Sequence, residues 1–211
     1  VYSAQTLQTL AGILEEKQRE YGHSVYIISD EPYRELVFGG KQSPYVASFY
    51  PNTFTCYSFS KSMSVPGERI GYVAVNPACE DAENAAAVFG QISREIGHNC
   101  PPSLIQLAIA RCIDDTADLS VYERNKEILY KELTRLGFYC VEPGGTFYMF
   151  PRSLEPDDAA FCERARKYDL LLVPGGGFGC PGHFRIAYCV PTEKVERSLP
   201  AFGKLAAEYM G

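Results

Sequence analysis

The stretch SFSKSMSVPGER, residues 58–69, carries one lysine, Lys61, among hydroxyl-bearing and small residues that predict a loop. It continues the run TFTCYSF, residues 53–59, whose β-branched and aromatic residues predict a strand that ends just before the lysine. The next run, IGYVAV at residues 70–75, predicts a second strand. Because the intervening loop is too short for a helical crossover, we expect these two strands to pair antiparallel.

The residues before this stretch predict a helix followed by a strand. Leucines recur at helical spacing, Ser3 can cap the helix and Gly22 lies beyond its end, so we expect a helix over residues 4–20. The short apolar run VYII, residues 25–28, is typical of a strand that is covered on both faces. A helix and a buried strand in this order predict an α/β fold with a mostly parallel sheet.

The remaining chain predicts two domains, residues 1–115 and 116–211, with the polar DDT at 114–116 as the boundary. In the first domain we expect helices at 78–96 and 103–113, with Ser103 as the cap of the second. The second domain is predicted to be a small α+β domain. We expect helices in it at 119–136, 157–168 and 192–210. We expect strands at 139–142, 146–150, 171–173 and 184–189.

Five residues of the first domain are of the types that pyridoxal phosphate (PLP) requires. The amine of Lys61 can form a Schiff base with the aldehyde of PLP. Ser58 and Arg69 can bind the phosphate through a hydroxyl and a guanidinium. A buried carboxylate at Asp30 would keep the pyridine nitrogen protonated, and Tyr33 would hydrogen-bond the 3-oxygen. Asp30 and Lys61 each follow a predicted strand, where ligands of such sheets bind.

Arg185, inside the strand-like run FRIAY at 184–188, is the candidate for binding the carboxylate of an amino-acid substrate. Each candidate also has an ordinary alternative. Lys61 would then be a solvated surface lysine, Asp30 a turn residue, Tyr33 a packing residue, Arg69 a partner of Glu68, and Arg185 a solvent-facing strand residue.

Taken together, several motifs resemble the class I/II aminotransferases of PLP fold type I, the aspartate aminotransferase superfamily. These motifs are SDEPY at 29–33, SFSKS at 58–62, PGERIGY at 66–72, GGTFY at 144–148, VPG at 173–175 and FRI at 184–186. The resemblance implies that Lys61 forms the internal aldimine, that Asp30, Tyr33, Ser58 and Arg69 bind PLP, and that Arg185 binds the substrate carboxylate.

The resemblance covers only about the second half of such an enzyme. It implies that residues 1–115 are the C-terminal part of the PLP-binding large domain and that residues 116–211 are the small domain. The glycine-bearing phosphate loop, the stacking aromatic and an asparagine of the first half have no counterpart here, so we expect a fragment. The family further implies amino-acid and 2-oxo-acid substrates and a homodimer, whereas the cytoplasmic location is predicted from the cysteine pattern.

Two other functions remain open from the sequence. A PLP-dependent lyase or decarboxylase of the same fold type would use the same residues as an aminotransferase. The chain could also be a catalytically inactive fragment that serves as an interaction module, because a sheet without its remaining strands exposes edges and apolar faces.

Composition argues against several other classes. The net charge of −6 and the lack of a basic block argue against a nucleic-acid partner, and the apolar runs are too short for a membrane span. The eight cysteines and three histidines show no metal-ligand spacing, so we expect no metal and mostly buried, reduced thiols. GFGCPG at 177–182 matches a dinucleotide fingerprint, but no helix is predicted after it, which excludes that reading.

Overall fold

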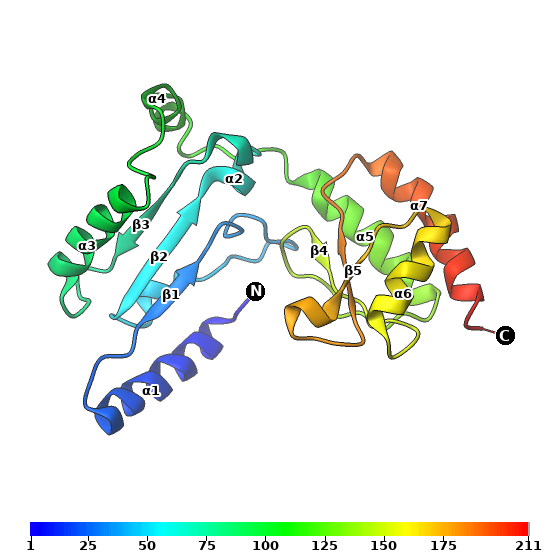
Figure 1. Cartoon of the computed structure of the whole chain (residues 1–211), viewed down its shortest axis with the longest axis horizontal. Coiled ribbons are helices and arrows are strands. Elements are labelled where there is room, and N and C mark those ends of the chain that lie inside the picture. Colours follow the sequence, from blue (N-terminus) through cyan, green and yellow to red (C-terminus); the bar gives the residue numbers. More distant parts are fainter. Residues whose placement is uncertain (211) are drawn as a thin grey trace. The chain divides into compact units, whose positions relative to one another are not determined.

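The computed structural model describes residues 1–210, and the chain divides into two compact units, Val1–Ala117 and Asp118–Gly211 (Figure 1). We call them unit 1 and unit 2 and describe each by itself. The sequence placed the boundary after residue 115, whereas the contacts of the structure divide the chain after Ala117. Unit 1 contains a mixed sheet with helices, and unit 2 contains three helices and a small antiparallel sheet.

The sheet of unit 1 has three strands in the order β1-β2-β3 (Figure 1). Strand β1 (Ile27–Asp30) pairs parallel with β2 (Thr53–Ser58), and β2 pairs antiparallel with β3 (Gly71–Val75). The predicted antiparallel pairing is therefore confirmed. The parallel pair brings the carboxyl ends of β1 and β2 to one edge of the sheet, which is where Asp30 and Ser58 lie.

Three longer helices belong to unit 1. Helix α1 (Ala4–Tyr21) begins where the Ser3 hydroxyl accepts a hydrogen bond from the N–H of Thr6 and ends at Gly22 in the left-handed conformation, as the sequence predicts. Helix α3 (Ala82–Glu95) starts later than predicted, because the residues before it form a turn in which the Asn76 side chain accepts from the N–H of Ala78.

Helix α4 (Ser103–Arg111) also differs from the prediction at its start. Ser103 was expected to cap it, but Ser103 is its first residue and Pro102 occupies the cap position without a side-chain hydrogen bond. Its buried residue Ile109 joins Tyr57, Phe59 and Ile70 in one apolar cluster. This cluster anchors the chain on both sides of Lys61.

The expectation that the first strand is covered on both faces is wrong. Ile28 is 72% exposed and Tyr26 is 40% exposed, and α3 has no buried residue at all. A strand is buried on both faces only where an element packs on each face. Within unit 1, the described residues cover the face of β2 that carries Thr53, Thr55 and Tyr57 far better than the opposite face.

Unit 2 is built on helices α5 (Ser120–Arg135), α6 (Asp158–Ala165) and α7 (Thr192–Ala207). Its antiparallel sheet has the order β4-β6-β5, with β4 spanning Tyr148–Met149, β5 spanning Val173–Pro174 and β6 spanning Phe184–Ala187. The predicted strand at 139–142 is absent. That segment makes one backbone hydrogen bond, from the N–H of Arg152 to the carbonyl of Tyr139, and therefore no ladder.

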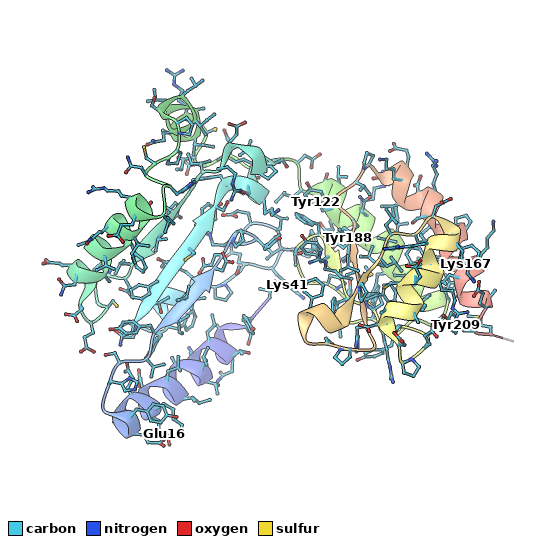
Figure 2. All side chains as sticks on the ribbon, in the orientation of Figure 1. Glu16, Lys41, Tyr122, Lys167, Tyr188 and Tyr209 are labelled. Atoms are coloured by element: carbon cyan, nitrogen blue, oxygen red, sulfur yellow. The ribbon has the colours of Figure 1, made fainter. Side chains whose placement is uncertain are left out.

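The core of unit 2 lies between this sheet and the helices. Phe138 meets the rings of Phe161, Phe184 and Phe202 edge to face. Tyr188, labelled in Figure 2, is fully buried and its hydroxyl donates to the carbonyl of Thr146 at 2.9 Å. Burial of each such aromatic side chain stabilises the fold by about 1.5 to 3 kcal/mol, so this core holds β6 firmly in place.

No helix within residues 1–210 combines the length and the apolar character needed to cross a membrane. The same residues contain no group of three or more histidine, cysteine or acidic side chains that could hold a metal ion. All eight cysteines are free thiols, but the expectation that most are buried is wrong, because only Cys79 and Cys162 are buried.

Candidate active site

The lysine of the SFSKS motif lies on a helical turn and not in a loop. Strand β2 leads directly into the short helix α2 (Phe59–Ser62), and Lys61 is its third residue. The Ser58 hydroxyl caps this turn by accepting a hydrogen bond from the N–H of Ser60 at 3.2 Å. The Tyr57 hydroxyl donates to the Ser62 hydroxyl at 3.0 Å, which fixes the far side of the turn. The backbone around Lys61 is therefore held by side chains on both sides.

Lys61 lies beside Tyr33, the residue predicted to contact the 3-oxygen of PLP. The ammonium nitrogen of Lys61 is 5.9 Å from the centroid of the Tyr33 ring, and both side chains are half-buried. Tyr33 belongs to the turn that follows β1, and Lys61 follows β2. The parallel pairing of β1 with β2 brings these two residues together.

Ion pairs hold the turn that carries Tyr33. The guanidinium of Arg34 pairs with Glu31 at 3.4 Å and with Glu35 at 3.3 Å, and it lies 4.4 Å from the centroid of the Tyr57 ring. Partial burial lowers the pKa of Arg34, but the hydrogen bond that Arg34 donates to Tyr72 and the charge of Glu35 outweigh it and raise the pKa. Arg34 is thus permanently charged and ties the turn to β2. Sequence reasoning missed this residue.

Three of the predicted cofactor residues line one pocket of about 500 Å³ in unit 1: Asp30, Ser58 and Arg69. The rest of its wall comes from β2, β3, the end of α3 and the segment 98–101. Lys61 and Tyr33 are not among the described residues of this wall. Residues from three separate segments of the sequence therefore face one cavity, and the volume is within the usual range for a small-molecule site.

The expectation that Asp30 is a buried carboxylate is wrong for the described residues, since Asp30 is exposed. The reason is the same as for Ile28: the described chain provides little cover for this face of β1. Arg69 is also exposed, has a left-handed backbone with φ of 52°, and donates from Nη1 to the carbonyl of Pro66 at 3.0 Å. That bond uses one of the five N–H donors of a guanidinium.

In unit 2, Arg185 lies on β6 between two aromatic rings. Alternation along β6 buries Phe184 and Ile186 in the core and places Arg185 on the other face, half-buried. Its guanidinium carbon is 4.6 Å from the centroid of Tyr148 and 4.4 Å from the centroid of Phe178. The buried Nε has no hydrogen-bond partner among the described residues. The alternative of an ordinary solvent-facing strand residue does not describe this environment.

Comparison with known proteins gives the family of the chain. The family model for class I and II aminotransferases matches residues 1–202. The chain belongs to this family. The aminotransferase resemblance seen in the motifs is therefore confirmed, and members of this family are transferases that use pyridoxal 5'-phosphate.

Individual aminotransferases match the chain over almost its whole length. Aspartate aminotransferase of Geobacillus stearothermophilus is 28% identical in an alignment 217 residues long that covers 94% of this chain and 52% of that protein. Aromatic-amino-acid aminotransferase 2 of Thermococcus litoralis is 29% identical in an alignment 201 residues long that covers 88% of this chain and 50% of that protein. The chain thus spans about half the length of these curated relatives.

Solved aminotransferase structures share the fold. An amino transferase from Eubacterium rectale matches with a TM-score of 0.97 and 46% identity, over 100% of this chain and 53% of that chain. Aspartate aminotransferase of Thermotoga maritima matches with a TM-score of 0.82 and 26% identity, over 98% of this chain and 53% of that chain. These matches confirm the predicted fold class, an α/β part of a PLP fold-type-I aminotransferase followed by a small α+β part.

Proposed function

We propose that this chain carries the cofactor-binding lysine of a PLP-dependent aminotransferase, which transfers an amino group from an amino acid to a 2-oxo acid. The observation that carries the proposal is the pocket lined by Asp30, Ser58 and Arg69, together with the Lys61–Tyr33 pair, in a chain with the family's fold. Because the chain spans about half of its relatives, the activity proposed is that of the whole protein.

The donor set in unit 1 has the chemistry that PLP needs. Asp30 offers a carboxylate for the ring nitrogen, Ser58 and Arg69 offer a hydroxyl and a guanidinium for the phosphate, and Tyr33 offers a phenol for the 3-oxygen. When bound, PLP supplies an electron sink for the bond broken at the substrate α-carbon. Lys61 would hold the cofactor through its amine, and when released would carry the α-proton as a general base.

In unit 2, Arg185 would bind the α-carboxylate of the substrate. A guanidinium presents two parallel N–H donors to a carboxylate, and the unpartnered Nε of Arg185 supports an acceptor at this position. Removing the carboxylate-binding group should weaken binding of every amino-acid substrate, whatever its side chain. The relatives named above are an aspartate and an aromatic-amino-acid aminotransferase, which differ in the substrate side chain.

We also propose a homodimer in a reducing, cytoplasmic compartment. The large exposed apolar side chains of unit 1, among them Ile28 and Leu104 at 72% and 75%, support a further protein surface over it. Eight free thiols support a reducing compartment. The net charge of −6 gives no support to a nucleic-acid partner.

The test is an absorbance titration of the chain with PLP followed by desalting. We expect a retained visible band that borohydride reduces, absent from Lys61→Ala and unchanged in Lys41→Ala, a matched variant of an exposed lysine of unit 1 (Figure 2). Mass analysis of the reduced protein should place the added group on Lys61. A band that Lys61→Ala retains would contradict the proposal. Absence of a band from all three proteins would show that this chain does not hold PLP by itself and would favour a catalytically inactive interaction module.

Substrate assays then separate the aminotransferase from related chemistry. With glutamate as donor and a panel of 2-oxo acids, we expect the amino group to appear on the acceptor. Release of ammonia or formation of an amine without transfer would favour a lyase or a decarboxylase of the same fold type.

A further inference from the structure

We infer that Tyr148 and Phe178 are positioning residues, which clamp the guanidinium of Arg185 in the orientation that receives a carboxylate. This inference rests on the role proposed above for Arg185 and extends it to two residues that sequence reasoning did not select. The two rings and the guanidinium belong to unit 2, so the argument depends on that unit alone.

The sheet register brings the first ring to Arg185. On β6, Arg185 and Ala187 share one face, and Tyr148 of β4 lies directly opposite Ala187. Tyr148 is therefore the diagonal neighbour of Arg185 on the same face, at 4.6 Å from ring centroid to guanidinium carbon. The second ring comes from the single helical turn Gly175–Phe178, which ends with Phe178 at 4.4 Å from the same carbon.

Aromatic contacts of this kind leave the ligand-binding edge of arginine available. An aromatic ring attracts a guanidinium by stacking on the flat face of the guanidinium. A carboxylate instead accepts hydrogen bonds from the N–H groups of the guanidinium, in the plane of that group. The described residues form no ion pair with Arg185 within 4 Å and offer no acceptor to its buried Nε. An unpaired buried donor is unfavourable until an acceptor arrives. The clamp thus holds a charged group with which no described residue forms an ion pair.

The clamp is itself held in place. Phe178 meets Phe150 edge to face at 6.0 Å, and Phe150 stacks on His183 at 5.9 Å. The turn before Phe178 is fixed by the buried Asp158, which accepts a hydrogen bond from the N–H of Gly176. On the other side, the ring of Phe147 packs on Tyr148 at 4.8 Å. Although Phe178 is 49% exposed, each ring therefore has a packing partner of its own within unit 2.

Support of the Arg185 side chain by the two rings should raise its affinity for a carboxylate. Arginine has several rotatable bonds, and ordering such a side chain on binding costs affinity unless it is ordered beforehand. Removing one ring leaves the charge of Arg185 unchanged but allows the side chain to move. Carboxylate binding should then weaken even though the residue that touches the carboxylate is still present.

The experiment follows Arg185 directly by NMR in the 211-residue chain with isotope-labelled arginine. The Arg185 Nε–H signal is assigned by its loss in Arg185→Lys. Titration with 2-oxoglutarate at constant ionic strength follows this signal, and calorimetry gives the affinity of every protein, including Arg185→Lys. The test variants are Phe178→Leu and Tyr148→Leu, each matched by a ring-keeping variant, Phe178→Tyr and Tyr148→Phe. Tyr139→Leu removes an exposed tyrosine of unit 2 and serves as the control.

We expect a ring-current shift of the Arg185 signal in the parent chain, reduced in both leucine variants and kept in both ring-keeping variants. The leucine variants should bind the 2-oxo acid about 3- to 30-fold more weakly, the range of one cation–π contact. The ring-keeping variants and Tyr139→Leu should bind as the parent does. Circular dichroism of each variant checks that unit 2 is folded.

Two results would overturn the inference in distinguishable ways. If both leucine variants bind as tightly as the parent while Arg185→Lys binds much more weakly, the clamp has no positioning role and the proposed role of Arg185 stands. If the parent signal does not respond to the 2-oxo acid, or Arg185→Lys binds as the parent does, the carboxylate role of Arg185 fails and the inference fails with it.

Discussion

The carboxylate of Asp158 accepts a hydrogen bond of 2.6 Å from the backbone N–H of Gly176, which joins the start of α6 to the glycine-rich turn before β6. Asp158 is buried and Gly176 is exposed, so the bond anchors a surface turn to the interior. Asp158→Ala removes the acceptor of a charge-assisted bond. We expect the free energy of unfolding to fall by about 1.5 to 3 kcal/mol, measured by urea denaturation.

Asp158→Asn is the matched control for that prediction, because its side-chain oxygen can still accept from the N–H of Gly176. It should lose clearly less stability than Asp158→Ala. Equal losses in the two variants would show that the charge or the packing of Asp158, and not this hydrogen bond, holds the turn.

Gly71 is the first residue of β3 and pairs with Ser58 of β2. A Cβ atom on Gly71 would be 2.3 Å from the carbonyl oxygen of Tyr57, a distance that backbone atoms must move to relieve. Gly71→Ala should therefore destabilise the chain by about 1 to 3 kcal/mol and disturb the adjacent Ser58. Urea denaturation measures the loss.

Gly67→Ala is a suitable comparison, since a Cβ on Gly67 would meet no heavy atom within 4 Å. That variant should change the free energy of unfolding by less than about 0.5 kcal/mol. A Gly71→Ala protein as stable as Gly67→Ala would mean that the close approach of the two strands is easily relieved.

The parts of the fold that the sequence predicted well depend on local signals. Helix α1 begins at Ser3 and ends at Gly22 because both caps act within a few residues of the helix end. The burial of β1 was predicted wrongly because burial depends on what packs against a strand, and a short apolar run such as VYII does not report it. The strand expected at 139–142 failed for a related reason: apolar residues do not supply a pairing partner.

In the candidate site, too, the sequence predicts residues that belong to local motifs and misses those that only the packing brings together. Ser58, Lys61 and Arg69 could be selected from one short motif, and Asp30 from its place after a strand. Tyr148 and Phe178 could not be selected, because their approach to Arg185 depends on the register of strands of only two and four residues and on a turn that buried Asp158 fixes. Once the register is known, the position of Tyr148 opposite Ala187 is a sufficient signal.

The buried Cys162 and the half-buried Cys140 should make the free energy of unfolding depend on pH. Burial raises the pKa of Cys140 and Cys162 from 9.0 to about 11. Between these values the unfolded chain loses thiol protons that the folded chain keeps, so the folded state binds more protons. The stabilisation from this difference is full below about pH 9 and is lost as the pH rises through about 11.

The measurement is urea denaturation at several pH values from 8 to 11, compared with Cys162→Ala. The variant should show a shallower loss of stability over this interval, whatever its stability at neutral pH. Alkylation provides a second readout: the exposed Cys100 and Cys189 should react with iodoacetamide well before Cys162. Parallel pH curves for the two proteins would exclude a contribution from Cys162.

A variant of Asp30 can distinguish a role in cofactor binding from a role in stability, because the Asp30 side chain is exposed and yet lines the pocket of unit 1. Asp30→Asn should leave the free energy of unfolding of the PLP-free chain within about 0.5 kcal/mol of the parent. It should weaken PLP binding by about 10- to 100-fold, the range of a hydrogen bond between two charged groups, since the amide cannot balance a protonated ring nitrogen. Absorbance titration with PLP gives the affinity, and Asp114→Asn is the control for an exposed carboxylate elsewhere in unit 1. An unchanged PLP affinity in Asp30→Asn would assign Asp30 to the turn after β1 and remove it from the cofactor site.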